Sequence, residues 1–168
     1  RVDPPLYYAF LWAWIPLAGT SEFALRLPSL VCGVAALWLL WRCGRAWFSP
    51  AAGAAATWLL AANPLAILYS QEARFYEALL LCGLLACQSF DRLVIEGGAR
   101  RAQLAYAVAG AALFYLHFMG VLVVAAHALF LARAPLGREA KRRALGALLG
   151  VGVLVGPYLL GVLYLYLL

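Results

Sequence analysis

Polar side chains gather in the segment YSQEARFYEALL, Tyr69–Leu80, of a chain that is otherwise strongly apolar. Gln71, Glu72, Arg74 and Glu77 fall within seven consecutive positions of it. Charged groups inside a bilayer are costly and are commonly functional where they are kept. A carboxylate can act as a general base, and the planar fork of an arginine can bind two phosphate oxygens. The segment is therefore the first candidate for chemistry, and its role depends on the helices that position it.

The composition indicates that these helices lie in a membrane. Of the 168 residues, 67% are hydrophobic and 12% are charged, whereas a soluble domain is about half apolar with about a quarter of its residues charged. Long apolar segments cross bilayers as helices, so the sequence predicts an all-α fold, a polytopic transmembrane helical bundle. The net charge of +6 is not accompanied by a basic stripe with interleaved aromatic residues, so no nucleic-acid partner is expected.

The predicted elements begin with a helix at the extracytoplasmic membrane interface. Residues 4–18 are too few to span a bilayer, and their Tyr and Trp side chains favour the headgroup level, which predicts a juxtamembrane helix. The predicted spans that follow cover 22–46, 50–69, 74–90, 102–116, 119–132 and 144–168. All belong to one transmembrane domain over residues 1–168. Because the chain starts without Met and ends within an apolar run, we expect an internal piece of a larger protein.

Local signals define several of these boundaries. Ser21 is a predicted N-cap, and Glu22 with Arg26 forms an i,i+4 pair that supports the start of the first span. Pro28 is expected to kink or restart that helix, since it lacks an N–H. Asn63-Pro64 predicts a break near the end of the second span.

The charge distribution predicts which side of the membrane each loop faces. Residues 102–132 in one helix would measure about 46 Å against a hydrocarbon core of about 30 Å, so we predict a break at 116–120. With that break, ten basic residues lie on one face, which the positive-inside rule assigns to the cytoplasm: Arg42, Arg45, Arg92, Arg100, Arg101, Arg133, Arg138, Lys141, Arg142 and Arg143. The segment 69–80 then lies at the extracytoplasmic face.

Four phrases occur in an order that resembles a known family. They are DPPLYY (3–8), SEFALRLPS (21–29), YSQEARFY (69–76) and ALFYLHFMGVL (112–122). Together they resemble bacterial membrane glycosyltransferases of the GT-C class, glycosyltransferase family 39-like, of the protein O-mannosyltransferase and aminoarabinose-transferase type. The resemblance covers nearly the whole chain.

The resemblance implies an activity and a location. Members transfer a sugar from a polyprenyl-phosphate donor to a protein, lipid or glycan acceptor, within a many-helix bundle whose active site faces away from the cytoplasm. The implied partners are this donor, membrane lipid and an unknown acceptor, and the implied location is the bacterial inner membrane. The family's catalytic Asp usually precedes the Pro-Pro phrase, upstream of residue 1. This chain has Asp3 where relatives often carry His or Lys.

Three residues are candidates for the catalytic groups. Arg74 is the candidate for contact with the donor phosphate, with an ion pair to Glu77 at i,i+3 as its structural alternative. Glu72 is a candidate carboxylate, and its alternative is a polar cap at the end of a span. Asp3 could act as the base, orient an arginine or contact the acceptor; its alternative is a solvated terminal residue.

Five further residues are candidates for substrate binding: Tyr7, Tyr8, Gln71, Tyr76 and His117. The two N-terminal tyrosines could equally anchor the helix at the interface. Tyr76 is expected to share a helix face with Glu72 at i,i+4, and His117 could instead bond to backbone at a hairpin tip. The other histidine, His127, is expected to have a packing role, as are the cysteines Cys32, Cys43, Cys82 and Cys87.

No metal site or organic cofactor is predicted, and the involvement of a divalent cation at the donor phosphate stays open. Two other classes of function also stay open. A transporter or flippase would have inverted repeats and broken helices with polar residues at the membrane midplane. The sequence has no convincing repeat, and the Asn63-Pro64 break is only one such feature. A non-catalytic membrane subunit would use its aromatic face for a partner.

Overall fold

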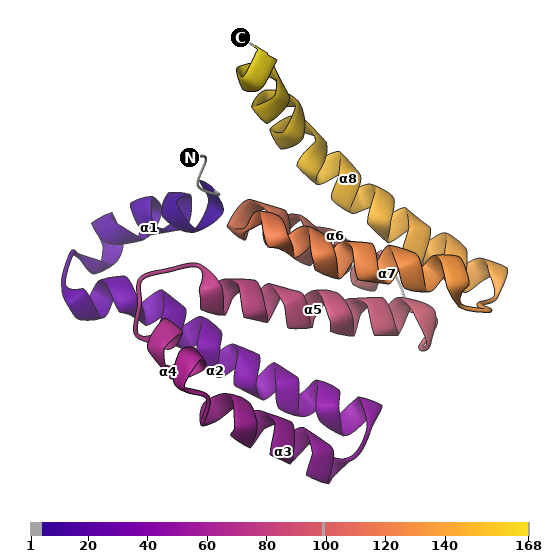
Figure 1. The fold of residues 1–168 in the computed structure, drawn as a ribbon, viewed down its shortest axis with the longest axis horizontal. Coiled ribbons are helices and arrows are strands. Elements are labelled where there is room, and N and C mark those ends of the chain that lie inside the picture. The colour runs from indigo at the N-terminus through magenta and orange to yellow at the C-terminus, as the bar shows by residue number, and fades with distance from the viewer. Residues whose placement is uncertain (1–4, 99, 168) are drawn as a thin grey trace. The chain divides into compact units, whose positions relative to one another are not determined.

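The computed structural model describes residues 5–98 and 100–167, and every regular element in that part of the chain is a helix (Figure 1). The predicted all-α fold is therefore confirmed. The chain divides into two compact units, residues 1–84 and 85–168.

The first unit begins with α1 (Pro5–Ala18) and α2 (Glu22–Trp47). Asp3 and Pro4, at the predicted start of the juxtamembrane helix, lie outside the described residues. Ser21 caps α2 as predicted, since its hydroxyl accepts a hydrogen bond from the N–H of Ala24 at 3.2 Å. The predicted Glu22–Arg26 ion pair is also present.

The helix α2 runs without interruption through Pro28, so the predicted restart of the helix there is wrong, and a kink at this position stays a prediction. A proline lacks the N–H that would bond to the carbonyl four residues earlier, which here belongs to Ala24. The indole N–H of Trp14, on α1, donates to that carbonyl at 2.8 Å. The vacant acceptor is thereby satisfied, and α1 is fastened to the first turn of α2.

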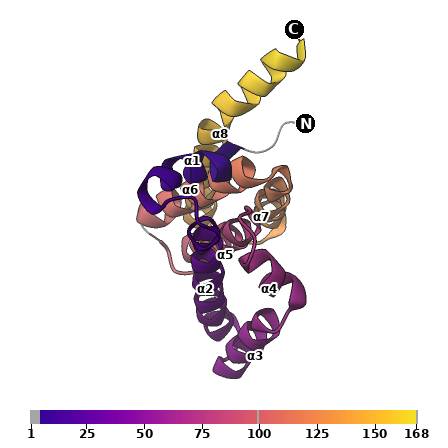
Figure 2. The ribbon, with the colours of Figure 1, turned by 90° about the vertical axis from the view of Figure 1, so that its left-hand side faces the viewer.

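The two helices α2 and α3 (Pro50–Ala61) form a hairpin, visible in Figures 1 and 2. Two glycines lie at its contact. A Cβ placed on Gly44 would lie 2.7 Å from the Cα of Gly53, and a Cβ on Gly53 would lie 2.7 Å from the amide nitrogen of Arg45. Only residues without a Cβ permit this backbone approach, a common form of packing between membrane helices.

The predicted break at Asn63-Pro64 separates α3 from α4 (Pro64–Ser70), which is bent by 65° relative to α3 (Figure 2). The side-chain oxygen of Asn63 accepts from the N–H groups of Leu65 and Ala66, at 2.9 and 3.4 Å. Asn63 thus caps the new helix, while Pro64 occupies its first turn, where no donor is needed.

The helix α5 (Tyr76–Val94) begins in the first unit and continues into the second, which also contains α6 (Arg100–Leu116), the 3-10 turn η1 (Phe118–Gly120), α7 (Val121–Arg133) and α8 (Arg138–Leu167). Small side chains line the contact between α6 and α8. Gly150 on α8 faces Ala107 so closely that an added Cβ would lie 3.0 Å from the Ala107 Cβ. Both helices can therefore approach closely.

The interior of the second unit contains a stacked aromatic group. Tyr106 is fully buried, and its hydroxyl lies 3.1 Å from Nδ1 of His127. The His127 ring stacks on Phe90 with a centroid distance of 4.2 Å. The predicted packing role of His127 agrees with these contacts.

Two helices in the described part of the chain, α2 and α8, are long and apolar enough to cross a membrane, and the bent pair α3–α4 could form a third span. The turn η1 lies where the sequence predicts a break. Crossing of the membrane by the shorter helices at 74–90, 102–116 and 119–132 stays a prediction.

Candidate active site

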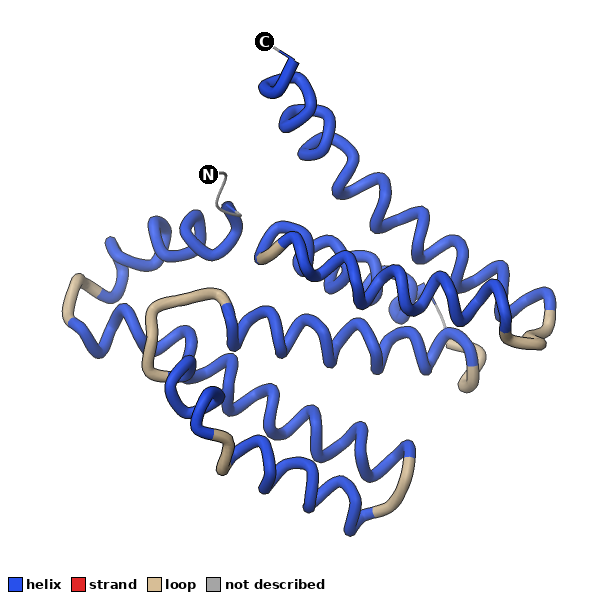
Figure 3. Tube along the Cα trace, in the orientation of Figure 1, coloured by secondary structure: helices blue, strands red, loops and turns tan. Residues whose placement is uncertain are grey.

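The predicted catalytic segment is a loop, residues 71–75, between α4 and α5 (Figure 3). The N–H groups of Gln71 and Glu72 bond to the carbonyls three residues earlier, at 3.1 and 3.3 Å, which tightens and ends α4. The N–H of Arg74 then bonds to the carbonyl of Glu72 at 2.9 Å. Because these residues are not helical, the expectation that Glu72 and Tyr76 share a helix face is wrong.

A chain of hydrogen bonds fixes the backbone of this loop. The Ser29 hydroxyl, which is fully buried on α2, donates to the carbonyl of Arg74 at 3.1 Å. The Tyr7 hydroxyl lies 2.8 Å from the same Ser29 oxygen. A serine hydroxyl carries one hydrogen, and a carbonyl can only accept, so Tyr7 is the donor to Ser29. Residues from α1, α2 and the loop are thereby joined.

The Arg74 side chain is exposed and lies among polar groups. Its Nε is 3.5 Å from Oε2 of Glu72. The hydrogen bond to the Tyr76 hydroxyl, the Glu72 carboxylate and the nearby Tyr8 raise the pKa of Arg74 above its usual value. The guanidinium is held as a cation, and its remaining N–H groups are available to an anionic ligand.

The structural alternative for Arg74, an ion pair with Glu77, is wrong. Glu77 lies in the first turn of α5, is only 4% exposed and points toward α2. A Cβ on Gly33 would lie 3.1 Å from Oε2 of Glu77. The carboxylate lines a small cavity of about 100 Å³ whose other walls are largely apolar. Arg74 is paired with Glu72 instead.

Aromatic rings surround the start of α5. Tyr76 stacks on Tyr69 with a centroid distance of 4.1 Å, and Phe75 lies 4.5 Å from Tyr76. The stack holds the Tyr76 ring in place, and the Tyr76 hydroxyl forms the hydrogen bond with Arg74. The predicted binding residue Tyr76 is therefore brought to the predicted cation.

Gln71 is exposed and faces a different hollow. It lines a cavity of about 330 Å³ together with Ser70 and the α2 residues Glu22 and Arg26. Arg26 had been assigned only to the start of α2. Arg26 and Gln71 line the same cavity, so Arg26 is a second arginine beside the loop 71–75.

The other candidates are placed as follows. Tyr7 is buried against Ser29, whereas Tyr8 is 48% exposed. His117 belongs to the second unit, where its Nδ1 accepts from the N–H of Met119 at 3.2 Å and its ring stacks on Phe118. The backbone-bonded alternative for His117 is thus observed. Asp3 lies outside the described residues.

Comparison with known families gives one match. Residues 2–164 match the family described as dolichyl-phosphate-mannose-protein mannosyltransferase. The chain belongs to this family. No curated protein and no solved structure matches the chain. The match confirms the resemblance drawn from the four sequence phrases, and the protein is a membrane glycosyltransferase of this family.

Sequence reasoning missed two residues of this mannosyltransferase-family site. Ser29 had no assigned role, although the phrase SEFALRLPS that contains it carried the resemblance. Glu77 was expected beside Arg74 and is buried instead. Both roles depend on partners 45 and 44 positions away in the chain, Arg74 for Ser29 and Gly33 for Glu77.

The loop 71–75 thus presents the Arg74 guanidinium and the neighbouring Glu72 carboxylate at an exposed position. A guanidinium can bind phosphate oxygens, and a carboxylate can accept a proton or orient the guanidinium. Within the described residues, no group of three or more His, Cys, Asp or Glu side chains could hold a metal ion. The residues present are suited to binding an anionic leaving group.

Proposed function

We propose that the protein transfers a sugar from a polyprenyl-phosphate donor to an acceptor on the extracytoplasmic side of a bacterial inner membrane. The family description, which names a dolichyl-phosphate-mannose donor and a protein acceptor, supports this class of reaction. The excess of basic residues on the opposite predicted face supports the sidedness.

The observation that carries the proposal is the position of Arg74 in this family member. Its backbone is bonded to Ser29, its side chain is exposed, and Glu72 and Tyr76 lie beside it. A fixed cation at the end of a membrane helix is suited to a phosphate that is attached to a lipid embedded beside it. Arg74 is therefore the proposed contact for the donor phosphate.

The proposed reaction is a substitution at the anomeric carbon of the sugar. The oxygen of the acceptor hydroxyl forms a bond to this carbon, and the bond from carbon to the donor phosphate oxygen breaks. The electron pair of that bond goes to the phosphate, whose added charge Arg74 stabilises. A carboxylate accepts the acceptor's proton, with Glu72 and Asp3 as the proposed groups. Tyr7, Tyr8, Gln71, Tyr76 and His117 are the proposed substrate contacts.

The test is sugar transfer by the full-length protein in membranes supplied with radiolabelled polyprenyl-phosphate sugars. We expect Arg74→Ala to lower transfer by about a hundredfold, the effect typical of removing one group that stabilises transition-state charge. Glu72→Gln should lower it as well, because the carboxylate is lost while the shape is retained.

Arg92→Ala is the matched control. Arg92 is also a half-exposed arginine paired with a glutamate, Glu96, at 4.0 Å, but it lies in the last turn of α5. Its substitution should leave transfer unchanged. Full activity of a well-expressed Arg74→Ala protein would overturn the role of Arg74. Absence of transfer from every donor by the unsubstituted protein would overturn the enzyme proposal and favour a transporter or a non-catalytic subunit.

A further inference from the structure

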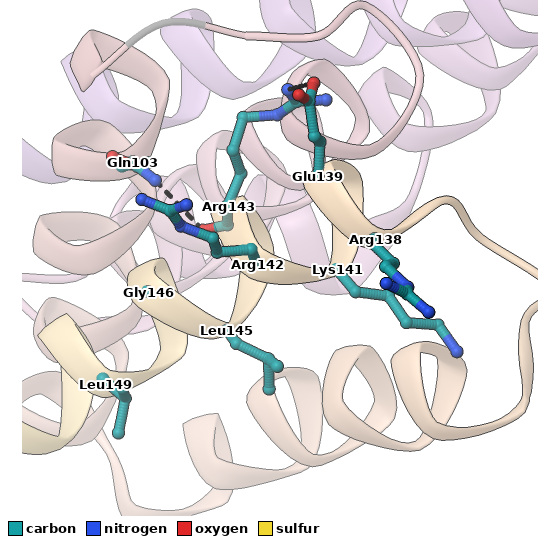
Figure 4. A pocket seen from close by; sticks show the side chains of 9 residues that line it. All are labelled: Gln103, Arg138, Glu139, Lys141, Arg142, Arg143, Leu145, Gly146 and Leu149. Atoms are coloured by element: carbon teal, nitrogen blue, oxygen red, sulfur yellow. Dashed lines mark hydrogen bonds and ion pairs between the residues drawn. The ribbon is translucent and has the colours of Figure 1, made fainter.

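A basic hollow of the second unit lies beside the first turns of α8, where they face α6 (Figure 4). Its volume is about 780 Å³. It belongs to neither the loop 71–75 nor the hollow at Gln71, and the proposed sugar transfer does not use it.

The charge of this hollow is strongly positive once its internal pairs are counted. Arg143 is held by Glu139, at 3.6 Å, and by the carbonyl of Leu93, at 3.4 Å. That pair accounts for the one acidic residue in the lining. The other cations, Arg138, Lys141 and Arg142, form no ion pair within residues 5–98 and 100–167.

The lining positions of α8 run from charged to apolar along the helix. Positions 138, 141, 142, 145 and 149 follow helical spacing, so they form one stripe. Figure 4 shows Arg138 and Lys141 extending to the same side of α8, whereas Arg142 extends toward Gln103; Leu145 and Leu149 lie farther along the helix. Leu149 is 71% exposed, and the equally exposed Val153 continues the stripe in the next turn.

The wall opposite α8 is polar at the same level. Gln103 on α6 lines the hollow, and its side-chain amide donates to the carbonyl of Arg143 at 3.2 Å. This bond fixes α6 against the charged turn of α8. The hollow is therefore a formed surface of the second unit, with a cationic end and an apolar end.

We infer that this surface binds an anionic diacyl phospholipid. The phosphodiester would lie beside Arg138 and Lys141, with Arg142 on the Gln103 side of the same hollow, and an acyl chain would follow Leu145, Leu149 and Val153. The rise of a helix places Leu149 about 10 Å beyond Arg142, a distance suited to a headgroup at one end and an acyl chain at the other. A basic hollow between helices at a membrane surface is a recurrent site for anionic headgroups.

The shared chemistry of the candidate ligands is a phosphate oxyanion. A soluble phosphate would satisfy the cations but would leave the exposed leucines uncovered, and this favours a lipid. The charge-to-apolar order along α8 matches the order within a phospholipid. The proposed ligand is therefore a phosphatidylglycerol-type lipid. Soluble phosphates and polyprenyl phosphates are the alternatives that the experiment distinguishes from it.

The experiment measures how much radiolabelled phosphatidylglycerol stays with the full-length protein after gel filtration in a neutral detergent, with phosphatidylcholine as the reference lipid. The unsubstituted protein should retain phosphatidylglycerol preferentially. The variant with Arg138→Gln, Lys141→Gln and Arg142→Gln should lose affinity for it by about a hundredfold, because each basic residue contributes about fivefold. Leu149→Gln should also weaken retention.

The matched control carries Arg100→Gln, Arg101→Gln and Arg133→Gln. These residues are exposed, lie on the same predicted face and do not line the hollow. The control removes the same charge and should retain the lipid.

Three results would overturn the inference: equal retention of both lipids by the unsubstituted protein, an equal loss in the control, or displacement by glycerol phosphate at the concentration that displaces the lipid. Stronger retention of a polyprenyl phosphate would likewise overturn it and would reassign the surface to the donor lipid. The first comparison needs no substitution, so it stands even where a variant fails to fold.

Discussion

At the residue scale, the Ser29 hydroxyl joins two parts of the site. It accepts from Tyr7 and donates to the carbonyl of Arg74. The bond to Tyr7 is buried and the bond to Arg74 is partly buried, and an unmet hydrogen-bonding group in such a setting is costly. The position of the catalytic candidate therefore depends on a residue that would not touch the substrate.

Tyr7→Phe should lower the stability of the protein. The substitution removes the donor to Ser29 and leaves the buried phenyl ring in place, so the free energy of unfolding should fall by about 1 kcal/mol. The measurement is the temperature of unfolding in detergent, followed by the helical circular dichroism. Tyr8→Phe is the control, since Tyr8 is 48% exposed and has no such bond to Ser29. An equal shift for both variants would contradict the role of the bond.

Tyr7 should also make the stability of the protein decrease at alkaline pH. Burial raises the pKa of Tyr7 above its usual 10.0, an effect that the bond to Ser29 partly offsets. The fold therefore favours the neutral phenol, while the unfolded chain ionises at the usual value. This stability is fully present below about pH 10 and is lost as the pH rises above it. In an alkaline titration of unfolding temperature, Tyr7→Phe should show a smaller decline than the unsubstituted protein, and parallel curves would contradict this.

At the scale of elements, the hairpin of α2 and α3 depends on the contact between Gly44 and Gly53. Gly53→Ala would place a Cβ 2.7 Å from the Arg45 nitrogen and 2.8 Å from the Trp41 carbonyl, which are backbone atoms that cannot move alone. We expect a loss of about 1–3 kcal/mol, the usual effect of overpacking. Thermal unfolding in detergent measures it.

Gly83→Ala is the matched control for this prediction. Gly83 lies within α5, and a Cβ there would meet no atom within 4 Å. Alanine is the better helix former by about 1 kcal/mol, so this variant should be unchanged or slightly more stable. A destabilised Gly83→Ala alongside an unaffected Gly53→Ala would contradict the packing of the hairpin.

The elements also show how much the sequence could predict. The Ser21 cap, the Glu22–Arg26 pair and the break at Asn63 are determined within a few residues, and all three are present. Pro28 was predicted to kink or restart α2, and the helix does not restart there. The donor that replaces the missing N–H, Trp14, lies on another helix, so the local sequence does not reveal it. Local patterns thus predicted these three features, whereas contacts between different elements depend on residues far apart in the chain.

The site divides in the same way. Residue types identified Glu72, Arg74 and Tyr76, which the structure brings together. Helical spacing then assigned Arg74 to Glu77, because the sequence alone does not reveal that residues 71–75 leave the helix. The link from Arg74 to Ser29 spans 45 positions, and no local pattern encodes it.

At the scale of the whole molecule, large apolar side chains lie on the outside. Trp12, Trp58 and Leu149 are among the most exposed. A soluble protein would cover contiguous apolar surface of this kind, whereas lipid or neighbouring helices can contact it. The exposed surface agrees with the composition, with α2 and α8 as candidate spans and with membership of a membrane glycosyltransferase family.

The predicted sidedness can be measured directly in the full-length protein. With the native cysteines replaced by alanine, Gln71→Cys should react with a membrane-impermeant maleimide in intact cells. Gly137→Cys should react only in inverted vesicles, because its loop carries the basic residues expected in the cytoplasm. Both positions are exposed, so access to the reagent depends on sidedness. Labelling of both positions from one side would contradict the predicted topology.

Ser29 binds position 74 through its peptide carbonyl, a group that every amino acid carries. The location of the backbone there is therefore independent of the side chain attached to it. A photoreactive amino acid installed at this position would be presented where the guanidinium now lies. On illumination it would form a covalent crosslink to its neighbour, and the mass of the adduct would identify the natural ligand of the loop from a whole cell membrane.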